Sequence, residues 1–340
     1  MKKNKKFYLG LDMSKPFFDA TLQIICGNQK QELPPQQFEN NKAGLKLFEQ
    51  WLKNSGVSYD ENTLVVIENT GIYHRLIWNF CSSKNIPIHI GNAAHIKWSL
   101  GIARGKSDKI DSQRLCTYGY RHRGELQCTP ALNPEFLEFK DLMTNRTRLM
   151  SQMTGLKAYL NELKNVSDKK FVKVQQQCNK TVLEGFKKSI KAIDEQIKTR
   201  ITKDEQIQTN YRLLRTVPGI GHWIALYLIV CTKNFTNGIS GKQLACYAGV
   251  VPFEHSSGIS IRGRNRVHKM ANKELKRLLH LGALSAIKYY DEFRQYYQRK
   301  KEEGKHSMTV LNAIRNKIIL RAASVVNNQK PYVNYTHDAA

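Results

Sequence analysis

A stripe of leucines that recurs every seven residues constrains the fold of this chain more than any other feature. It consists of Leu142, Leu149, Leu156 and Leu163, with Met153 and Leu160 at companion positions. After a polar stretch at 165–170, the apolar spacing resumes with Phe186, Ile190, Ile193, Ile197 and Ile201. This spacing is typical of a coiled coil, and the interruption predicts an antiparallel helical hairpin over 131–210. A helical core element is the alternative, but the narrow stripe and its highly charged flanks favour an arm that spaces or joins subunits.

Strand and helix patterns alternate before this stripe, in residues 1–130. The segments 7–14 (FYLGLDMS) and 17–26 (FFDATLQIIC) predict a β-hairpin, and 64–71 (LVVIENTG) and 86–92 (IPIHIGN) predict two further strands. Helices are predicted over 41–54, 72–83 and 108–121, the first from the spacing of Leu45, Phe48 and Leu52. A strand pair followed by strand–helix alternation predicts an α/β fold, with helices on the faces of one sheet.

Residues 211–340 form a third predicted domain, which is mostly helical with a turn-rich patch at 249–264. Between 258 and 301 there are twelve lysines and arginines against three acids. Aromatic side chains interleave with them, namely Tyr289, Tyr290, Phe293, Tyr296 and Tyr297. Basic and aromatic residues together suit phosphate neutralisation and base stacking. A solvated basic helix face explains the tract equally well by itself, but the formal net charge of +26 for the whole chain favours a polyanionic partner.

Composition excludes several classes of protein. With 41% hydrophobic residues the chain can build cores, so it is not wholly disordered. The longest strongly apolar run, 224–231, is far shorter than the roughly 20 residues of a membrane span, so we expect no membrane insertion. The basic N-terminus is interrupted by Asp12 and is no secretory signal. The seven scattered cysteines contain no CxxC pair, which argues against a zinc finger and indicates reduced thiols in the cytoplasm.

Four acidic residues stand out in so basic a chain. Asp12 and Glu68 end predicted strands, and Asp108 and Asp111 share one face of a predicted helix. If the first strand neighbours the strand that ends at Glu68, Asp12 and Glu68 emerge side by side, and a nearby helix can add the other two. Such carboxylates repel one another unless a cation lies between them, and Mg²⁺ or Mn²⁺ prefers oxygen ligands. Two such ions roughly 3.5–4 Å apart can activate an attacking oxygen and stabilise a leaving one.

Each of these acids has a simpler explanation when it is taken alone. Asp12 can close a turn, Asp108 can cap a helix, and Asp111 can complement the helix dipole. All four in strand–helix order favour the metal site. Lys106 and Lys109, which flank Asp108, would suit a nearby phosphate backbone.

Three motifs stand out in the N-terminal part, LGLDMSKPFFDATL, VVIENTGIYHRLIWNF and NAAHIKWSLGIARGKSDKIDSQRLCTYGY. Two more stand out in the C-terminal part, LLRTVPGIGHWIALYLI and QLACYAGVVPFEHSSGISIRGRNRVHKMANKELKRLLHLGALSA. The order of these motifs resembles that of the IS110 insertion-sequence transposases, also called DEDD transposases. The likeness covers roughly residues 6–122 and 211–325. Ser112 departs from the alanine that the family commonly has after its last aspartate, a change that should not alter metal chemistry.

The resemblance implies an RNase-H-like (RuvC-type) N-terminal domain with a metal site at Asp12, Glu68, Asp108 and Asp111. It also implies a serine nucleophile in the C-terminal domain, at Ser257 with Ser256 and Ser260 as close rivals. It further implies recombination of donor and target DNA in the bacterial cytoplasm, on the nucleoid. A structured noncoding guide, the bridge RNA, would pair with both DNAs, and dimers would join into tetramers. A guide would explain a basic chain that has no sequence-reading motif.

Serine suits recombination because a phosphoserine link keeps the energy of the broken bond. Its hydroxyl needs activation by a base or a metal, which a composite site of the two domains could supply. Without the resemblance, Ser256–Ser257–Gly258 is better explained as an ordinary turn. Arg262, Arg264 and Arg266 alternate just after it and, with Lys269, are expected to bind the scissile backbone.

The segment TVPGIGHW (216–223) is typical of the turn of a helix-hairpin-helix. The backbone N–H groups near Gly219 and Gly221 could approach a phosphate, but a ligand-free turn between helices is an equally good interpretation. For the whole chain, a recombinase is the first functional hypothesis. A Holliday-junction-type nuclease that uses only the acidic site is the second, and a basic nucleic-acid-binding scaffold without chemistry is the third.

Overall fold

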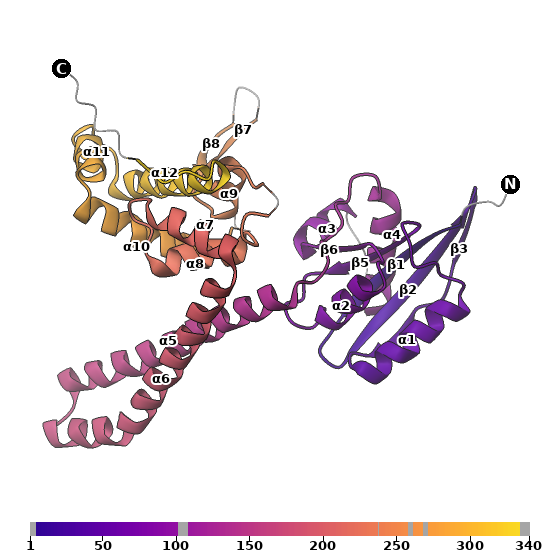
Figure 1. Cartoon of the computed structure of the whole chain (residues 1–340), viewed down its shortest axis with the longest axis horizontal. Coiled ribbons are helices and arrows are strands. Elements are labelled where there is room, and N and C mark those ends of the chain that lie inside the picture. Colours follow the sequence, from indigo (N-terminus) through magenta and orange to yellow (C-terminus); the bar gives the residue numbers. More distant parts are fainter. Residues whose placement is uncertain (1–4, 101–107, 237, 258–260, 268–270, 334–340) are drawn as a thin grey trace. The chain divides into compact units, whose positions relative to one another are not determined.

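The computed structural model describes residues 5–100, 108–236, 238–257, 261–267 and 271–333 (Figure 1). The chain divides into two compact units, residues 1–133 and 134–340. The first unit is mixed α/β, and the described part of the second is mainly helical with one strand pair. Among the described residues, no helix combines the length and the apolar character that a bilayer crossing needs.

The first unit is built on one mixed sheet. Its strands are β1 (Lys5–Met13), β2 (Phe17–Cys26), β3 (Gln29–Glu32), β4 (Gln36–Glu39), β5 (Thr63–Glu68) and β6 (Ile88–Gly91). Their order is β3-β2-β1-β5-β6, and β4 pairs with another part of β2. The first two strands are antiparallel, whereas β1–β5 and β5–β6 are parallel. The predicted hairpin and both later strands are therefore present, while the short β3 and β4 were not predicted.

Helices cover both faces of this sheet because the strand side chains alternate between two apolar layers. Leu9, Leu11 and Ile67 pack in the layer that also holds residues of α1 (Lys42–Asn54) and α2 (Arg75–Ser83). Tyr8 and Val66 pack on the other face, in the layer that holds residues of α4 (Asp108–His122). A short helix, α3 (Ala93–Ser99), follows β6 and was not predicted.

Helix α4 lies unusually close to β1. A β-carbon added to Gly10 would overlap the backbone oxygen of Ser112 and the backbone nitrogen of Cys116. The buried hydroxyls of Thr21 and Ser112 are 2.8 Å apart and share a hydrogen bond between β2 and α4. Backbone contact and this hydroxyl pair together fix the position of α4 along the sheet.

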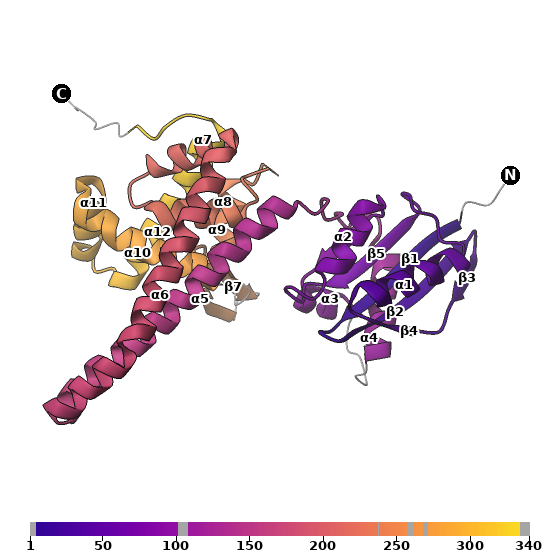
Figure 2. The ribbon, with the colours of Figure 1, turned by 60° about the horizontal axis from the view of Figure 1, so that its bottom comes forward.

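Two long helices open the second unit, α5 (Pro134–Val166) and α6 (Lys169–Lys203). They lie side by side in Figures 1 and 2. Their antiparallel register is marked by ion pairs of Arg146 with Asp194 at 2.7 Å and of Arg200 with Glu138 at 3.0 Å. Met153 and Leu160 of the predicted stripe are buried, and Leu156 and Leu163 are partly exposed. The turn between the helices is two residues long, shorter than the predicted break.

Helix α8 (His222–Cys231) is apolar on all sides and largely buried, and it shares one core with the remaining helices of the unit. They are α7 (Glu205–Arg215), α9 (Gly241–Tyr247), α10 (Lys273–Tyr289), α11 (Asp291–Glu302) and α12 (Ser307–Asn327). The predicted turn-rich patch instead contains an antiparallel strand pair, β7 (Phe253–Ser257) and β8 (Ile261–Arg266). Glycine, serine and arginine there gave no alternating apolar pattern, so sequence periodicity could not reveal the strands.

Candidate active site

A row of polar residues crosses the first sheet at one level. Leu11 of β1 pairs with Ile67 of β5, so the next residues along these parallel strands are Asp12 and Glu68. On the other side of β1, Asp12 pairs with Asp19 of β2. Asp19 in turn pairs with Gln37 of β4. Because neighbouring strands lie about 4.8 Å apart and paired residues share a face, three acids and an amide form a continuous row.

This row lies on the sheet face that α4 covers. Gly10, two residues before Asp12 on β1 and therefore on the same face, touches the backbone of Ser112. Asp111 directly precedes Ser112, so α4 brings a further carboxylate to this face of the sheet. Asp111 is partly exposed and accepts a hydrogen bond from Arg114 at 2.7 Å. Asp108 begins α4 one turn earlier, and its side chain lies outside the described part of the structure.

The ionisation of Glu68 depends on its burial and on a charge carried by α4. Burial raises the pKa of the Glu68 carboxyl above its ordinary value, and the negative charge of Asp111 raises it further. A neighbouring cation would favour the charged form of both acids and relieve this repulsion. The oxygen-only donors of Asp12, Glu68 and Asp111 match the ligand preference of Mg²⁺ and Mn²⁺. No three acidic, histidine or cysteine side chains within the described residues are gathered closely enough to form a metal site. The side chain of Asp108 lies outside those residues.

Asp19 is the acid that the sequence reasoning missed. Its side chain is 4% exposed and accepts a hydrogen bond from Nε2 of Gln37 at 3.2 Å. No ion pair among the described residues neutralises it. The alternation in FFDATLQ, aligned antiparallel to LGLDM, could have placed this aspartate opposite Asp12.

The candidate serines lie at the end of β7. Ser256 pairs with Arg262 and Ser257 with Ile261, whereas Phe253 pairs with Arg266 at the other end of the hairpin. The side chains of both serines and of Arg262, Arg264 and Arg266 lie outside the described part of the structure, as does all of Ser260. Lys106 and Lys269 are also outside it, and Lys109 is described only as a residue of α4.

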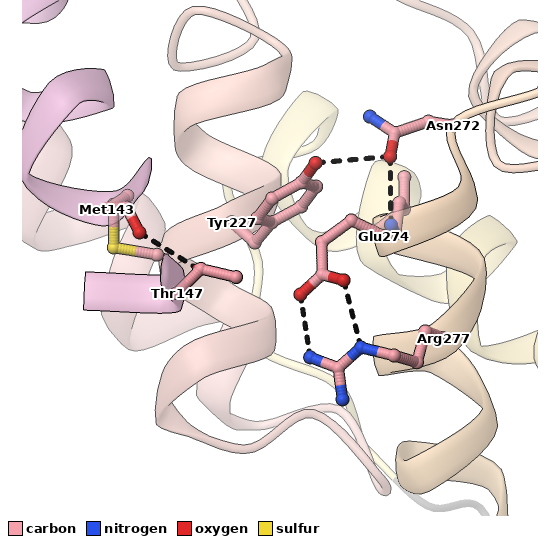
Figure 3. Close-up of polar contacts among 7 residues, drawn as sticks. Met143, Thr147, Tyr227, Asn272, Glu274 and Arg277 are labelled. Carbon is pink, nitrogen blue, oxygen red and sulfur yellow. Dashed lines mark hydrogen bonds and ion pairs between the residues drawn. The ribbon is translucent and has the colours of Figure 1, made fainter. Parts of the chain in front are cut away.

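The hairpin is tied at both of its ends. After β8, the backbone N–H of Asn272 donates to the carbonyl of Tyr247 at 2.8 Å, and its side-chain amide donates to the Tyr247 hydroxyl at 2.8 Å. The hydroxyl of Tyr227 donates to Oδ1 of Asn272 at 3.1 Å (Figure 3). That oxygen also caps α10 by accepting from the N–H of Leu275 at 2.9 Å. Before β7, Asn312 of α12 donates to the carbonyl of Val250 at 2.7 Å.

Burial raises the pKa of the Tyr227 hydroxyl to about 12. The hydroxyl is protonated at neutral pH and donates its hydrogen bond to Asn272. Beside it, Glu274 forms a two-bonded ion pair with Arg277, with the shorter bond at 2.6 Å (Figure 3). The base of the hairpin is therefore anchored to α8, α9, α10 and α12.

Gly219 and Gly221 lie between α7 and α8. Gly219 has a φ of +85°, and a β-carbon there would come within 2.7 Å of the backbone oxygen of Gly282 in α10. Close packing against α10 therefore explains the absence of a side chain at Gly219. Gly221 caps the N-terminus of α8 without a side-chain hydrogen bond.

The five aromatic residues of the basic tract differ in how far they are buried. Tyr289 and Tyr290 are exposed, whereas Phe293 is 1% exposed and belongs to the core. Tyr296 and Tyr297 pack partly against that core. The expectation that all five rings offer stacking surfaces is therefore wrong for Phe293, because the helix α11 turns that ring inward.

Comparison with known proteins gives matches in both units. Residues 9–165 match the model of a DEDD transposase domain named for IS110, and residues 211–298 match that of the transposase IS116/IS110/IS902 family. The pilin gene-inverting proteins of Moraxella bovis and Moraxella lacunata are each 28% identical, over 98% of this chain and 99% of their own length. An uncharacterized 43.6 kDa protein of insertion element IS110 from Streptomyces coelicolor is 34% identical over 31% of this chain and 26% of its own.

The two family models match in the order in which the acidic row and the serine hairpin occur along the chain. Alignment with the Moraxella proteins spans both units. The protein therefore belongs to the IS110 family of DEDD transposases and is a DNA transposase or recombinase.

Proposed function

We propose that this chain cuts and rejoins DNA strands with four carboxylates and one serine. The carboxylates are those of Asp12, Glu68, Asp108 and Asp111, carried by an RNase-H-like (RuvC-type) domain, and the serine is Ser257. The observation that supports the proposal most is the register of the sheet, which makes Asp12 and Glu68 neighbours on the face covered by α4. The order of a hairpin followed by parallel strands is compatible with that fold.

Mg²⁺ or Mn²⁺ is the cofactor that this donor set fits. The two strand-end acids and the two acids of α4 would hold it, and Asp19 would add negative charge beside Asp12. When bound, the metal supplies charge neutralisation and activation of an oxygen for phosphodiester chemistry. The raised pKa of Glu68 beside Asp111 supports this assignment, because carboxylates placed to share a cation repel one another when no cation is bound.

The serine step balances as a transesterification. The Ser257 oxygen bonds to the scissile phosphorus, the bond to one DNA oxygen breaks, and the proton lost by serine is matched by one gained at the leaving oxygen. The reverse reaction with a hydroxyl from another strand reseals the backbone without ATP. Arg262, Arg264, Arg266 and Lys269 would hold phosphates near this step. Lys106, Lys109 and the turn at Gly219 and Gly221 would bind backbone elsewhere.

The DNA partners are proposed to be donor and target segments that a structured bridge RNA brings together by pairing. The printed name of the Moraxella relatives refers to inversion of a pilin gene. Inversion and transposition both need cut strands to be exchanged, so one chemistry serves either outcome. We further propose that subunits pair as dimers and join into tetramers, with the arm formed by α5 and α6 as a contact element.

The decisive experiment traps the covalent intermediate. Full-length protein is incubated with Mg²⁺, its co-purifying RNA and DNA that carries the ends of the element. Denaturing electrophoresis is then used to detect protein linked to DNA. We expect an adduct with the wild type and with Ser256→Ala and Ser260→Ala, and none with Ser257→Ala or Asp12→Asn. Cleavage without any adduct would instead favour a nuclease that uses the acids alone, and neither cleavage nor adduct would favour a binding scaffold.

A further inference from the structure

The second unit buries an arginine that no carboxylate among the described residues neutralises. Arg315 of α12 is 5% exposed. Its Nη2 lies 2.6 Å from Nδ1 of His280 on α10, and its Nε is buried without a hydrogen-bond partner. The ion pairs of the described residues do not include Arg315. An uncompensated buried charge is strongly unfavourable, so a position of this kind points to an anion that binds there.

The partner of Arg315 makes the position more selective for an anion. A guanidinium carries donors only, so Nδ1 of His280 must accept, and the imidazole is neutral with its proton on Nε2. Burial lowers the pKa of His280, and the charge of Arg315 lowers it further, which agrees with the neutral form. The pair can therefore offer N–H groups but has no free acceptor. His280 is partly exposed, and Lys276 lies one turn away along the same side of α10.

The position of this pair connects it with the serine hairpin. Asn312, one turn before Arg315 on α12, holds the carbonyl of Val250 at the entry to β7. Asn272, which caps α10 two turns before His280, holds the exit from β8. The two helices that carry the pair are thus among those that anchor the hairpin.

We propose that Arg315 and His280 form a binding site for a phosphate group of the nucleic-acid backbone, beside the base of the hairpin. The N–H groups of Arg315 and His280 would contact the non-bridging oxygens of the phosphate, and the guanidinium would neutralise the phosphate charge. The identity of the anion as backbone phosphate rests on the proposed function, whereas the existence of an anion site rests on the buried charge alone.

The test compares stability with and without an anion. Full-length wild type and Arg315→Met are unfolded thermally in buffer free of phosphate and sulfate, and again with inorganic phosphate. For the wild type we expect phosphate to raise Tm. For Arg315→Met we expect an equal or higher Tm without the anion, because the buried charge is gone, and no rise with phosphate. A lower Tm without the anion together with an undiminished phosphate shift would overturn the proposal, because both results fit a purely structural arginine.

Two further variants sharpen this result. Arg294→Met removes an exposed arginine that pairs with Asp291, and it should keep the phosphate shift of the wild type. His280→Gln keeps one acceptor and one N–H donor and should retain most of the shift, whereas His280→Leu should lose it. Equal losses for Arg294→Met and Arg315→Met would mean general charge screening and would contradict a specific site.

Binding of single DNA and RNA strands of equal length then tests the source of the phosphate. For Arg315→Met, the slope of log K against log salt concentration should fall by about one unit relative to the wild type. A fall with DNA only, RNA only or both identifies which backbone is bound. An unchanged slope with both would overturn the assignment to nucleic acid. Ser257→Ala should bind with the wild-type slope, so failure of the serine chemistry remains distinguishable from failure of this site.

Discussion

The two elements proposed for catalysis are held in place by different means. The acidic row of the first unit is fixed by backbone pairing across β5, β1, β2 and β4, with α4 in direct backbone contact with β1. The serine hairpin of the second unit is a single strand pair whose ends are tied by two asparagine side chains. From this difference we expect the acidic row to be sensitive to any change in backbone spacing, and the hairpin to the loss of individual amides.

The charges of the two units follow the same division. The first unit has 18 lysines and arginines against 11 acids, and the second has 36 against 17. Most of the excess positive charge therefore lies in the second unit, which contains the serine hairpin. Within the described residues, each unit also buries a charged side chain that forms no ion pair, Asp19 in the first and Arg315 in the second. Their signs suit a cation and a phosphate, respectively.

Gly10→Ala should produce the largest effect. A small effect would contradict the view that backbone contact between β1 and α4 fixes the acidic row. The new methyl group would overlap the backbone of α4, so the helix that carries Asp111 must move. We expect the free energy of unfolding to fall by at least about 1–3 kcal/mol, with loss of strand cleavage. Chemical denaturation and a cleavage assay measure both. Gly155→Ala, at an open helical position in α5, is the control and should stabilise by about 0.5–1 kcal/mol.

Asn272→Ala should come next, because it removes a helix cap and the links to two tyrosines. A loss of about 1–2 kcal/mol is expected in denaturant unfolding. If the hairpin depends on this anchor, formation of the covalent adduct should slow far more than DNA binding weakens. Tyr227→Phe removes one of these links, keeps the cap and should lie between the wild type and Asn272→Ala. Parallel losses of binding and adduct formation would show that the anchor does not position the hairpin.

Asp19→Asn tests the buried acid of the row. Removing its charge should weaken Mn²⁺ binding about 10–100-fold, the range typical of residues that support metal ligands. In the absence of metal, the variant should unfold at a higher temperature because a buried uncompensated charge is lost. Calorimetric titration and thermal unfolding give the two readouts. Glu61→Gln, at an exposed site in the same unit, should change neither, and a wild-type affinity for Asp19→Asn would remove Asp19 from the site.

The smallest effect concerns pH. Burial and Asp111 raise the pKa of Glu68 in the folded protein above its unfolded value, so the folded state binds more protons in the window between the two pKa values. The stabilisation from this proton is full below the unfolded pKa and is lost as the pH rises through the folded pKa. In a metal chelator, wild-type stability should therefore decline relative to Glu68→Gln as the pH rises from about 4. Identical pH profiles for the two proteins would mean that folding does not raise the pKa of Glu68.

Sequence patterns predicted the elements whose apolar residues alternate or recur regularly. They found the strands that carry Asp12 and Glu68, the helix that carries Asp108 and Asp111, and the long helical pair. They missed β7 and β8, whose polar residues have no apolar face to detect. The proposed roles of the four acids and of Ser257 remain predictions that the variants above test.

Other features depend on contacts between distant segments. Thr21 and Ser112 are 91 positions apart, and His280 and Arg315 are 35 apart, so neither pair follows from local spacing. Asp19 was within reach of sequence reasoning, because the antiparallel register of the first hairpin places it opposite Asp12. Its burial, however, depends on β4 and α4, which the alternation of β2 does not reveal.

The contact between Gly219 and Gly282 has a consequence for how this protein can change over time. A β-carbon at Gly282 would come within 2.5 Å of the carbonyl oxygen of Gly219, and one at Gly219 would meet the carbonyl of Gly282. Each obstacle is main chain, so shortening a neighbouring side chain cannot make room for either substitution. The two positions can vary only if α10 itself shifts, and descendants that keep this helix arrangement must inherit both glycines together.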